Sequence, residues 1–464
     1  MVTTAQTDAI DDLVYDWLAE TGAPGASLVV TDDTTEQYAA GFGSRDIDSN
    51  TPATPDTLYG VASVTKSFAT LAVLQQVERG ALALDDPITR HTRVAFEGAD
   101  EITIEKLLTH SSGLPNLGTS EVLLARLADL GEIGIPLSDR DDLYQFLGDA
   151  GAERDQHSQD RFQYSNTAYI LLSHALESVA DRPFDEYVEA EILDPLGMER
   201  STFDAEAFAA DDDHATPHRS VENGFEPTRF PARQLSRAAG GLISSPRELG
   251  KYLRCNLQGG ELDGVTLVDS ALLGRAHDSH VDPLPRYGDA YGYGWSRRTV
   301  AETVVVGHGG SLLTSSSAIG LLPERDLGIA LCCASQPELH PTVVLDGIVA
   351  ILEDDSPEQV VPELGYRSRV DALTGRYESY RGIISATVTD EGGYLSVDIA
   401  AGPIEEEHVL VPDDPTLTGD AGTADRVWTF TAPRSGRPMP VEFVDTGDGV
   451  DLFFDRYRLH RQSA

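Results

Sequence analysis

The sequence predicts two folded parts, an α/β domain with one mixed sheet and a smaller all-β domain after it. Strand-like runs occur early and late in the first part, with helical patterns between them, so both of its ends contribute to the sheet. Near residue 353 an acidic, proline-containing segment ends this pattern, and short alternating runs follow. The 464 residues are enough for two or three domains. We expect a first domain over 1–353, a linker over 354–372 and an all-β domain over 373–464.

In chain order, the first expected element is an amphipathic helix over residues 6–21, which ends near Gly22. Another helix is expected at 63–80, with apolar residues on one side and Gly80 as its stop. Further helical patterns lie at 103–110, 121–130, 140–149, 167–181 and 246–257. The strand-like runs of the first domain are 26–30, 37–43, 302–307, 316–322 and 327–333. Those of the second predict a small β-barrel or sandwich, at 383–389, 394–399, 406–411, 427–432, 440–444 and 450–459.

The charge of the chain is extreme, because 77 acidic residues stand against 34 basic ones and the formal net charge is −43. The acidic residues are scattered in short runs, which indicates a solvating surface suited to a salt-rich cytoplasm, where ions screen its self-repulsion. The alternative is an acidic patch that recruits a basic partner. Nucleic-acid binding is disfavoured, because affinity for phosphate rests on clusters of Lys and Arg that this sequence lacks.

Cysteine usage and the N-terminus point to a soluble, cytoplasmic protein. Cys255, Cys332 and Cys333 do not make a disulfide framework. The N-terminal residues lack the basic start and apolar core of a secretory signal, and no apolar run approaches the ~20 residues that span a bilayer. No spacing typical of metal ligands is present, since His308 and His340 stand apart and H-E-x-x-H is missing. We therefore expect no metal and no other cofactor.

The first motif that carries chemistry is S-x-x-K, formed by Ser63 and Lys66 at the start of the 63–80 helix. Residues three apart share a helix face, so hydroxyl and amine can meet there. Lysine is almost eliminated from this chain, and Lys66 is one of three that remain. A surface role would be served equally well by Arg, whereas only an amine can deprotonate when buried. The four-letter pattern alone is equally compatible with a structural role.

Two weaker motifs follow. Tyr164 and Asn166 lie just before the 167–181 helix, where a phenol can shuttle protons if neighbouring cations lower its pKa, and a carboxamide can orient a lysine. Tyr at a helix start is commonly only a packing residue. His308, Gly310 and Ser311 follow the strand at 302–307, where glycines allow close backbone approach and a following N–H can donate to an oxyanion. Such a histidine is more often structural than functional; otherwise it can polarise the phenol or hold a substrate carboxylate.

The order S-x-x-K, Y-S-N about a hundred residues later, and then H-x-G resembles the serine β-lactamase and penicillin-binding-protein family. The layout is that of the class C type with its esterase and peptidase relatives. Segments such as ITIEKLLTHSSGLP at 102–115, AAGGLISSPREL at 238–249 and YGYGW at 291–295 are also similar, and the resemblance covers roughly residues 8–352. It implies a penicillin-recognising α/β (α+β) fold, with an antiparallel sheet flanked by helices and an all-helical region. LTGRYESYRG at 373–382 resembles the start of the lipocalin-like β-barrel on some of these enzymes.

The resemblance also implies roles for the motif residues. Ser63 would attack an ester or amide carbonyl and form an acyl-enzyme, with Lys66 and Tyr164 acting together as base and then acid. Asn166 would hold Lys66 and the substrate amide. The backbone N–H groups of Ser63 and Ser311 would form the oxyanion hole, beside Gly310 and His308 in the substrate site. Water would then deacylate the enzyme, with Tyr164 as the base.

One departure from the family pattern bears on the substrate. β-Lactamases and cell-wall enzymes usually carry Lys-Thr-Gly where this chain has His308-Gly309-Gly310. A histidine that is only partly charged favours substrates without an obligatory carboxylate, so we place a peptidase (D-aminopeptidase or carboxypeptidase-like) or esterase on small molecules or short peptides above a β-lactamase. A binding protein without catalysis is the alternative from another class. The barrel is expected to serve oligomerisation or to wall the access of substrate.

Overall fold

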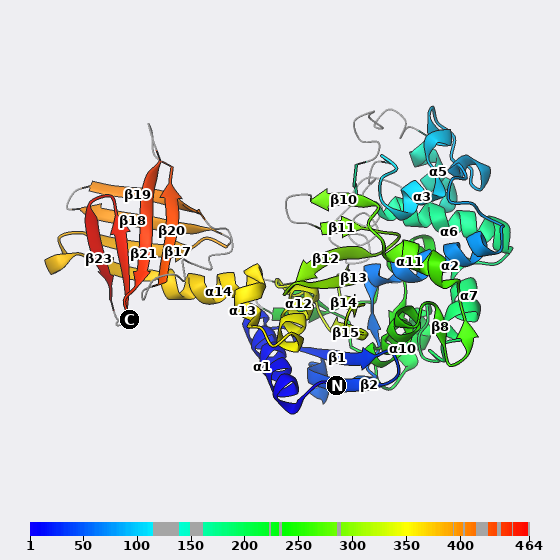
Figure 1. Ribbon diagram of the computed structural model, residues 1–464, viewed down its shortest axis with the longest axis horizontal. Coiled ribbons are helices and arrows are strands. Elements are labelled where there is room, and N and C mark those ends of the chain that lie inside the picture. The colour runs from blue at the N-terminus through cyan, green and yellow to red at the C-terminus, as the bar shows by residue number, and fades with distance from the viewer. Residues whose placement is uncertain are drawn as a thin grey trace. The chain divides into compact units, whose positions relative to one another are not determined.

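The computed structural model describes residues 1–114, 139–148, 161–221, 224–231, 234–284, 289–392, 394–401, 404–413, 426–433, 438–447 and 449–462. The chain divides into two compact units, Met1–Leu345 and Asp346–Ala464, and each is described by itself (Figure 1). The helix expected at 121–130 lies outside the described residues. None of the helices that the structure describes has the length and apolarity needed to cross a bilayer.

Within the described residues of the first unit, nine strands form one sheet, and every pairing in it is antiparallel. In spatial order the strands are β10 (Val281–Leu284), β11 (Asp289–Tyr291), β12 (Ser296–Val300), β13 (Thr303–Leu312), β14 (Ser315–Leu322), β15 (Leu327–Cys333), β1 (Gly25–Asp32), β2 (Glu36–Asp46) and β3 (Thr51–Pro52). Strand β1 lies between β2 and β15, with Ala26 opposite Cys333. The sheet is mixed only in that both ends of the domain supply its strands, as expected, and the antiparallel pairing that the family resemblance implies is confirmed.

Helices occupy the chain between the early and late strands and flank the sheet (Figure 1). The described helices of this unit, apart from single-turn 3₁₀ and π segments, are α1 (Thr4–Thr21), α2 (Thr65–Glu78), α3 (Ile104–Leu108), α5 (Arg140–Leu147), α6 (Asn166–Ala180), α7 (Phe184–Val188), α8 (Ala205–Ala210), α9 (Arg237–Gly240), α10 (Pro246–Leu257), α11 (Ser270–His277) and the start of α12 (Pro341–Leu352). The expected helices at 6–21, 103–110, 140–149, 167–181 and 246–257 correspond to α1, α3, α5, α6 and α10.

The register of the sheet places α10 and His308 on one face. His308 on β13 is opposite Ile319, which is opposite Ala330, which in turn is opposite Val29 on β1. Residues directly opposite one another in a sheet project to the same face. A Cβ atom at Gly250 of α10 would lie 3.2 Å from a methyl group of Val29, so α10 covers this face. His308 therefore projects toward the helical region rather than toward α1.

Helix α1 and the first residues of α12 lie on the other face. Val30, one residue beyond Val29, is opposite Tyr38, whose hydroxyl donates to Asp11 of α1. A Cβ at Gly309, next to His308, would lie 2.7 Å from Oγ1 of Thr342 at the start of α12. Because successive strand residues alternate between faces, these contacts confirm the opposite placement of His308.

The second unit contains a closed barrel of eight described strands. They are β16 (Gly375–Glu378), β17 (Ser385–Asp390), β18 (Leu395–Ala401), β19 (Ile404–Pro412), β20 (Arg426–Ala432), β21 (Met439–Asp445), β22 (Val450–Phe454) and β23 (Tyr457–Arg461). The expected all-β barrel is confirmed, and it is orange to red in Figure 1. The single run expected at 450–459 is a hairpin, because the chain turns at Asp455 with φ 54°. The segment expected as a linker carries α13 (Pro357–Val360) and most of α14 (Pro362–Leu373).

Candidate active site

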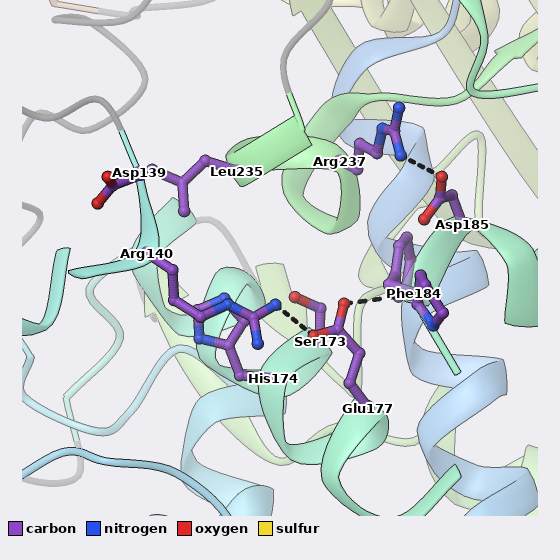
Figure 2. Close-up of a pocket in the computed structure, with 10 residues that line it drawn as sticks. Asp139, Arg140, Ser173, His174, Glu177, Phe184, Asp185, Leu235 and Arg237 are labelled. Atoms are coloured by element: carbon purple, nitrogen blue, oxygen red, sulfur yellow. Dashed lines mark hydrogen bonds and ion pairs between the residues drawn. The ribbon is translucent and has the colours of Figure 1, made fainter. Parts of the chain in front are cut away.

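Two of the cavities among the described residues of the first unit have different linings. The larger, of about 390 Å³, lies beside α5, α6 and α7 (Figure 2). Two ion pairs, Arg140 with Glu177 and Arg237 with Asp185, neutralise four of its five charged side chains, and the fifth, Asp139, caps α5. The smaller, of about 290 Å³, is bordered by Tyr164 and His308 and by Phe162, Asp289, Ala290, Tyr291, Ser296, Arg297, Arg298, Gly309 and Thr342. Two of the three sequence motifs, those of Tyr164 and His308, therefore border the smaller cavity, and size alone does not locate the site.

Ser63 lies at the junction of a short 3₁₀ turn, η1 (Ala62–Val64), and α2. The helix expected at 63–80 thus begins with a tighter turn. Ala62 has φ 48°, in the left-handed region that residues other than glycine seldom occupy. Strained backbone of this kind is typical of functional sites. It presents Ser63, which is half-buried, at the N-terminal end of α2.

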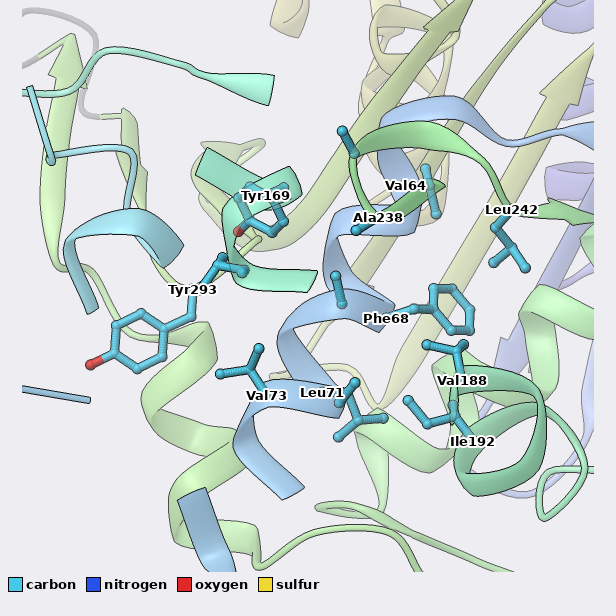
Figure 3. Close-up of a cluster of buried hydrophobic side chains, with 14 of the residues drawn as sticks. Val64, Phe68, Leu71, Val73, Tyr169, Val188, Ile192, Ala238, Leu242 and Tyr293 are labelled. Atoms are coloured by element: carbon cyan, nitrogen blue, oxygen red, sulfur yellow. The ribbon is translucent and has the colours of Figure 1, made fainter. Parts of the chain in front are cut away.

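Helix α2 is buried along most of its length, because apolar residues occupy nearly every side of it. Figure 3 shows Phe68 and Leu71 of this helix packed among side chains of other helices, including Val188 and Ile192. Lys66 is on the same helix and is 0% exposed. A lysine amine in such surroundings loses its hydration, and burial lowers the pKa of Lys66 well below its usual value.

The amine of Lys66 is held by polar groups from three separate parts of the chain. Its Nζ atom lies 3.1 Å from Oγ of Ser63, 2.8 Å from Oδ1 of Asn166 and 2.6 Å from the carbonyl oxygen of Ala239. Among the described residues no carboxylate pairs with it. A neutral amine has two N–H groups and one lone pair. The two carbonyl oxygens can take both N–H groups, which leaves the lone pair for the Ser63 hydroxyl.

Tyr164 and Asn166 flank the N-cap of α6, where the Ser165 hydroxyl accepts the N–H of Ala168. Nζ of Lys66 lies 4.8 Å from the centroid of the Tyr164 ring. Burial raises the pKa of the Tyr164 phenol, and a hydrogen bond with Ser63 opposes this only in part. The condition for a phenolate, cations that lower the pKa, is therefore not met. At neutral pH the Tyr164 phenol therefore keeps its proton, and burial disfavours the charged form of the Lys66 amine beside it.

Both ring nitrogens of His308 have partners. Nδ1 donates to the carbonyl oxygen of Gly309 at 2.6 Å, so Nε2 is unprotonated and accepts from the Tyr291 hydroxyl at 3.0 Å. Burial lowers the pKa of His308 to about 3. The partial charge expected near neutrality is thus absent. The centroids of the His308 and Tyr164 rings are 6.3 Å apart.

The glycines after His308 allow strand β13 to approach the backbone of η1 closely. A Cβ atom at Gly310 would lie 2.3 Å from the carbonyl oxygen of Val61 and 3.1 Å from Cβ of Ala62. The hydroxyl of Ser317, opposite Gly310, donates to the same Val61 oxygen at 2.7 Å. The reason for glycine here is therefore the approach of β13 to η1, and it brings Ser311 into the neighbourhood of the Ser63 turn.

Comparison with known proteins agrees with this geometry. A family model described as Beta-lactamase matches residues 10–351. The chain belongs to the β-lactamase family. A second model, described as the Pab87 octamerisation domain, matches residues 357–460 of this β-lactamase-family protein. The family and the fold expected from the motifs are both confirmed.

Three relatives are similar to this β-lactamase-family chain over most of its length. It is 31% identical to the octameric penicillin-binding protein homologue from Pyrococcus abyssi, with a TM-score of 0.87 over 98% of this chain and 100% of that one. It is 23% identical to the D-alanyl-D-alanine-carboxypeptidase/endopeptidase AmpH of Escherichia coli, over 74% of this chain and 87% of that protein. D-amino acid amidase from Ochrobactrum anthropi shares the fold at 22% identity, with a TM-score of 0.62 over 76% and 99% of the two chains.

Residue-by-residue reasoning missed three contributors to the site of this β-lactamase-family chain. Ala239 supplies only a main-chain oxygen, which no sequence pattern reveals. Tyr291 and His110 belong to the segments YGYGW and LTHSSG, which are similar to the family but suggest no role by themselves. Among the described residues, no group of three or more His, Cys, Asp and Glu side chains is arranged as a metal site.

Proposed function

We propose that this chain is a serine acyl-hydrolase that works through an acyl-enzyme on Ser63. The observation that carries the proposal is the surroundings of Lys66, which is fully buried, free of any carboxylate among the described residues, and 3.1 Å from the Ser63 hydroxyl. A lysine neutral at physiological pH is a competent general base. The position of Ser63 at the start of a helix favours a developing negative charge nearby.

In the proposed reaction, Nζ of Lys66 takes the hydroxyl proton while Oγ of Ser63 forms a bond to the carbonyl carbon of the substrate. The N–H groups of Ser63 and Ser311 donate to the oxyanion. As the bond to the leaving group breaks, the Tyr164 phenol protonates that group and recovers a proton from Lys66. Water then attacks the acyl-enzyme, and its proton passes through Tyr164 and Lys66 back to Oγ of Ser63.

We propose small amides and esters as substrates, with a peptidase or amidase favoured over a β-lactamase. His308 is neutral, so the third motif supplies no fixed cation for a substrate carboxylate. Aromatic walls from Phe162 and Tyr291 suit an apolar group, and the charges of the cavity come from Asp289, Arg297 and Arg298. Similarity to AmpH and to a D-amino acid amidase supports amide substrates, including those of D-configuration.

The test is covalent labelling by a fluorophosphonate probe, together with hydrolysis of p-nitrophenyl esters, in concentrated KCl. Ser63→Ala should abolish both, whereas the control Ser67→Ala should keep them, because Ser67 lies one turn along and its hydroxyl donates to the Val64 carbonyl oxygen, away from Ser63. Labelling that survives in Ser63→Ala would reject the nucleophile. An unlabelled wild-type protein would favour a binding protein without catalysis. D- and L-aminoacyl anilides and nitrocefin, tested in parallel, separate peptidase from β-lactamase.

We further propose that the protein forms homo-oligomers through its barrel and works in a salt-rich cytoplasm. The match to an octamerisation domain and the octameric Pyrococcus abyssi homologue support the first statement. So does an apolar outer strip on β19 and just before β18, where Val409, Val411 and Tyr394 are 44–47% exposed. Light scattering after gel filtration should show a multimer that Val409→Lys with Val411→Lys dissociates. A monomeric wild type would refute this.

A further inference from the structure

His110 is a buried histidine next to the proposed active site that the mechanism above does not use. It is 0% exposed, and its backbone has φ 56°, in the left-handed region. The centroid of its ring lies 4.3 Å from that of Tyr164. Strained backbone at a residue other than glycine persists only where its surroundings impose it. The contacts of His110 show what imposes it here.

His110 holds the chain on both sides of Tyr164. Its carbonyl oxygen accepts the N–H of Gln163 at 2.7 Å, and its Nδ1 atom accepts the N–H of Ser165 at 3.1 Å. One residue thus fixes the two amides that flank the phenol. The left-handed backbone lets the carbonyl group and the imidazole of one residue reach the same short segment.

The protonation of the ring follows from these bonds. Nδ1 is an acceptor, so the proton of the neutral ring is on Nε2. Burial keeps the pKa of His110 well below its usual value. Nε2 is buried and has no hydrogen-bond partner among the described residues. The rings of Phe162, Tyr169 and Tyr291 surround it, with centroids 5.1–5.8 Å from that of His110.

An unpaired buried N–H group and a left-handed backbone are both unfavourable. If His110 only filled space, Phe or Leu would fill it without the unpaired group. The feature that neither of them offers is the Nδ1 acceptor for the Ser165 amide. This acceptor is therefore the reason for histidine at position 110.

We propose that His110 is a positioning residue that holds the Tyr164 phenol at the Ser63 hydroxyl by fixing the amides of Gln163 and Ser165. The inference rests on the proposed function, in which Tyr164 protonates the leaving group. The proposal requires a hydrogen-bond acceptor at the position of Nδ1 of His110. It requires no polar group at the position of Nε2.

Three substitutions separate these atoms. In His110→Asn, Oδ1 takes the place of Nδ1, and Asn tolerates the left-handed backbone. In His110→Gln, the amide group takes the place of Nε2 instead, and in His110→Phe neither remains. The maximal rate of p-nitrophenyl ester acylation should fall about 100-fold in the Phe and Gln variants, with KM little changed, and stay within about tenfold of wild type for Asn. Equal rates in Phe and Asn would overturn the proposal.

The control is His174→Phe. His174 is also a buried, neutral histidine bonded through Nδ1, but to Tyr144 and beside the other cavity (Figure 2). The His174→Phe variant should lose stability without loss of acylation rate.

A double-mutant cycle then tests whether His110 acts through Tyr164. The loss caused by His110→Phe should vanish in a Tyr164→Phe background, and a loss of full size there would contradict a role through the phenol.

Amide hydrogen exchange keeps this inference separate from the proposed function. His110→Phe should speed exchange in a peptide that contains Gln163 and Ser165, relative to both wild type and His174→Phe. If the wild type is not acylated, the proposed function fails while faster exchange still supports the hold on this segment. Unchanged exchange would refute the role of His110 whatever the activity.

Discussion

The Lys66 amine donates to the carbonyl oxygen of Ala239, 173 residues further along the chain, at a distance of 2.6 Å. This bond ties α2 to α9, and together with Asn166 it occupies the two N–H groups of a neutral lysine. The lone pair is then directed to the Ser63 hydroxyl. The orientation of the proposed base thus depends on a main-chain group that no side-chain substitution removes.

Lys66→Arg should be almost as damaging as loss of the nucleophile, although it keeps a basic side chain. A guanidinium group does not deprotonate in proteins, so it cannot accept the Ser63 proton. We expect kcat/KM for p-nitrophenyl esters to fall by about 10²–10⁴-fold. The control is Lys251→Arg, because Lys251 is partly exposed beside Glu248 and lies outside the site. Activity that survives in the Lys66 variant would show that another group is the base.

The pH–rate profile of acylation should have a single rising limb, which corresponds to the titration of Lys66. The amine acts only when neutral, and burial lowers its pKa well below the ordinary value. The rate is therefore lost when the pH falls through that lowered pKa, and it is retained above it. His308 should add no limb near neutrality, because its pKa is about 3. Stopped-flow acylation between pH 5 and 10 measures the limb.

Asn166→Asp should move this limb to higher pH. The new carboxylate would take the place of Oδ1, which lies 2.8 Å from Nζ of Lys66. A neighbouring anion favours the charged amine and raises its pKa by about 1–3 units. Activity at pH 7 should fall and recover at alkaline pH, while Asn256→Asp, a control at another buried asparagine, should leave the limb in place. Loss at every pH would contradict this explanation.

Folding stability should fall steeply as the pH drops below about 6.5, the ordinary pKa of histidine. Burial lowers the pKa of His174 and of His308 to about 3 and that of His277 to about 4. The unfolded chain binds protons at pH values where these folded residues do not, so acid favours unfolding. Each should contribute up to about 1.4 kcal/mol per pH unit. Urea titrations from pH 4.5 to 7 should show a smaller slope for His174→Phe; an unchanged slope would rule out its contribution.

Salt should stabilise the protein. The formal charge of −43 makes the folded chain repel itself, and the screening length falls from about 10 Å at 0.1 M salt to about 3 Å at 1 M. The melting temperature should therefore rise from dilute buffer to 2 M KCl. Sorbitol at the same osmolality is the control, since it does not screen charge. A melting temperature that is flat or falls with KCl would refute the interpretation of the surface.

The sequence predicted those parts of the site that depend on the type and local spacing of side chains. The spacing of Ser63 and Lys66, and the scarcity of lysine, indicated a buried amine near a hydroxyl. The state of His308 could not be predicted, because its pKa depends on burial, and its tautomer depends on hydrogen bonds to a main-chain oxygen and to a tyrosine of another strand. The same is true of Ala239, whose contribution comes from the main chain.

Among the strands, too, features set by local sequence were predicted and features set by the tertiary structure were not. Runs rich in apolar residues marked β14 and β15, because both faces of these strands are buried, whereas the run at 302–307 stopped before the glycine-rich end of β13. The hairpin of β22 and β23 was merged into one run, because its turn lies at Asp455 rather than at glycine or proline. Positive φ at such residues follows from the tertiary structure and leaves little trace in the sequence.

The place of β1 in the sheet has a consequence for synthesis of the protein on the ribosome. Its partner β15 ends at Cys333, so one edge of β1 stays unpaired until some 300 further residues have been translated. Contacts of such long sequence separation form slowly, and unpaired edges favour aggregation. The nascent chain must therefore protect Gly25–Asp32 through most of its elongation, which predicts a stronger dependence on chaperones than the stability of the finished protein would indicate.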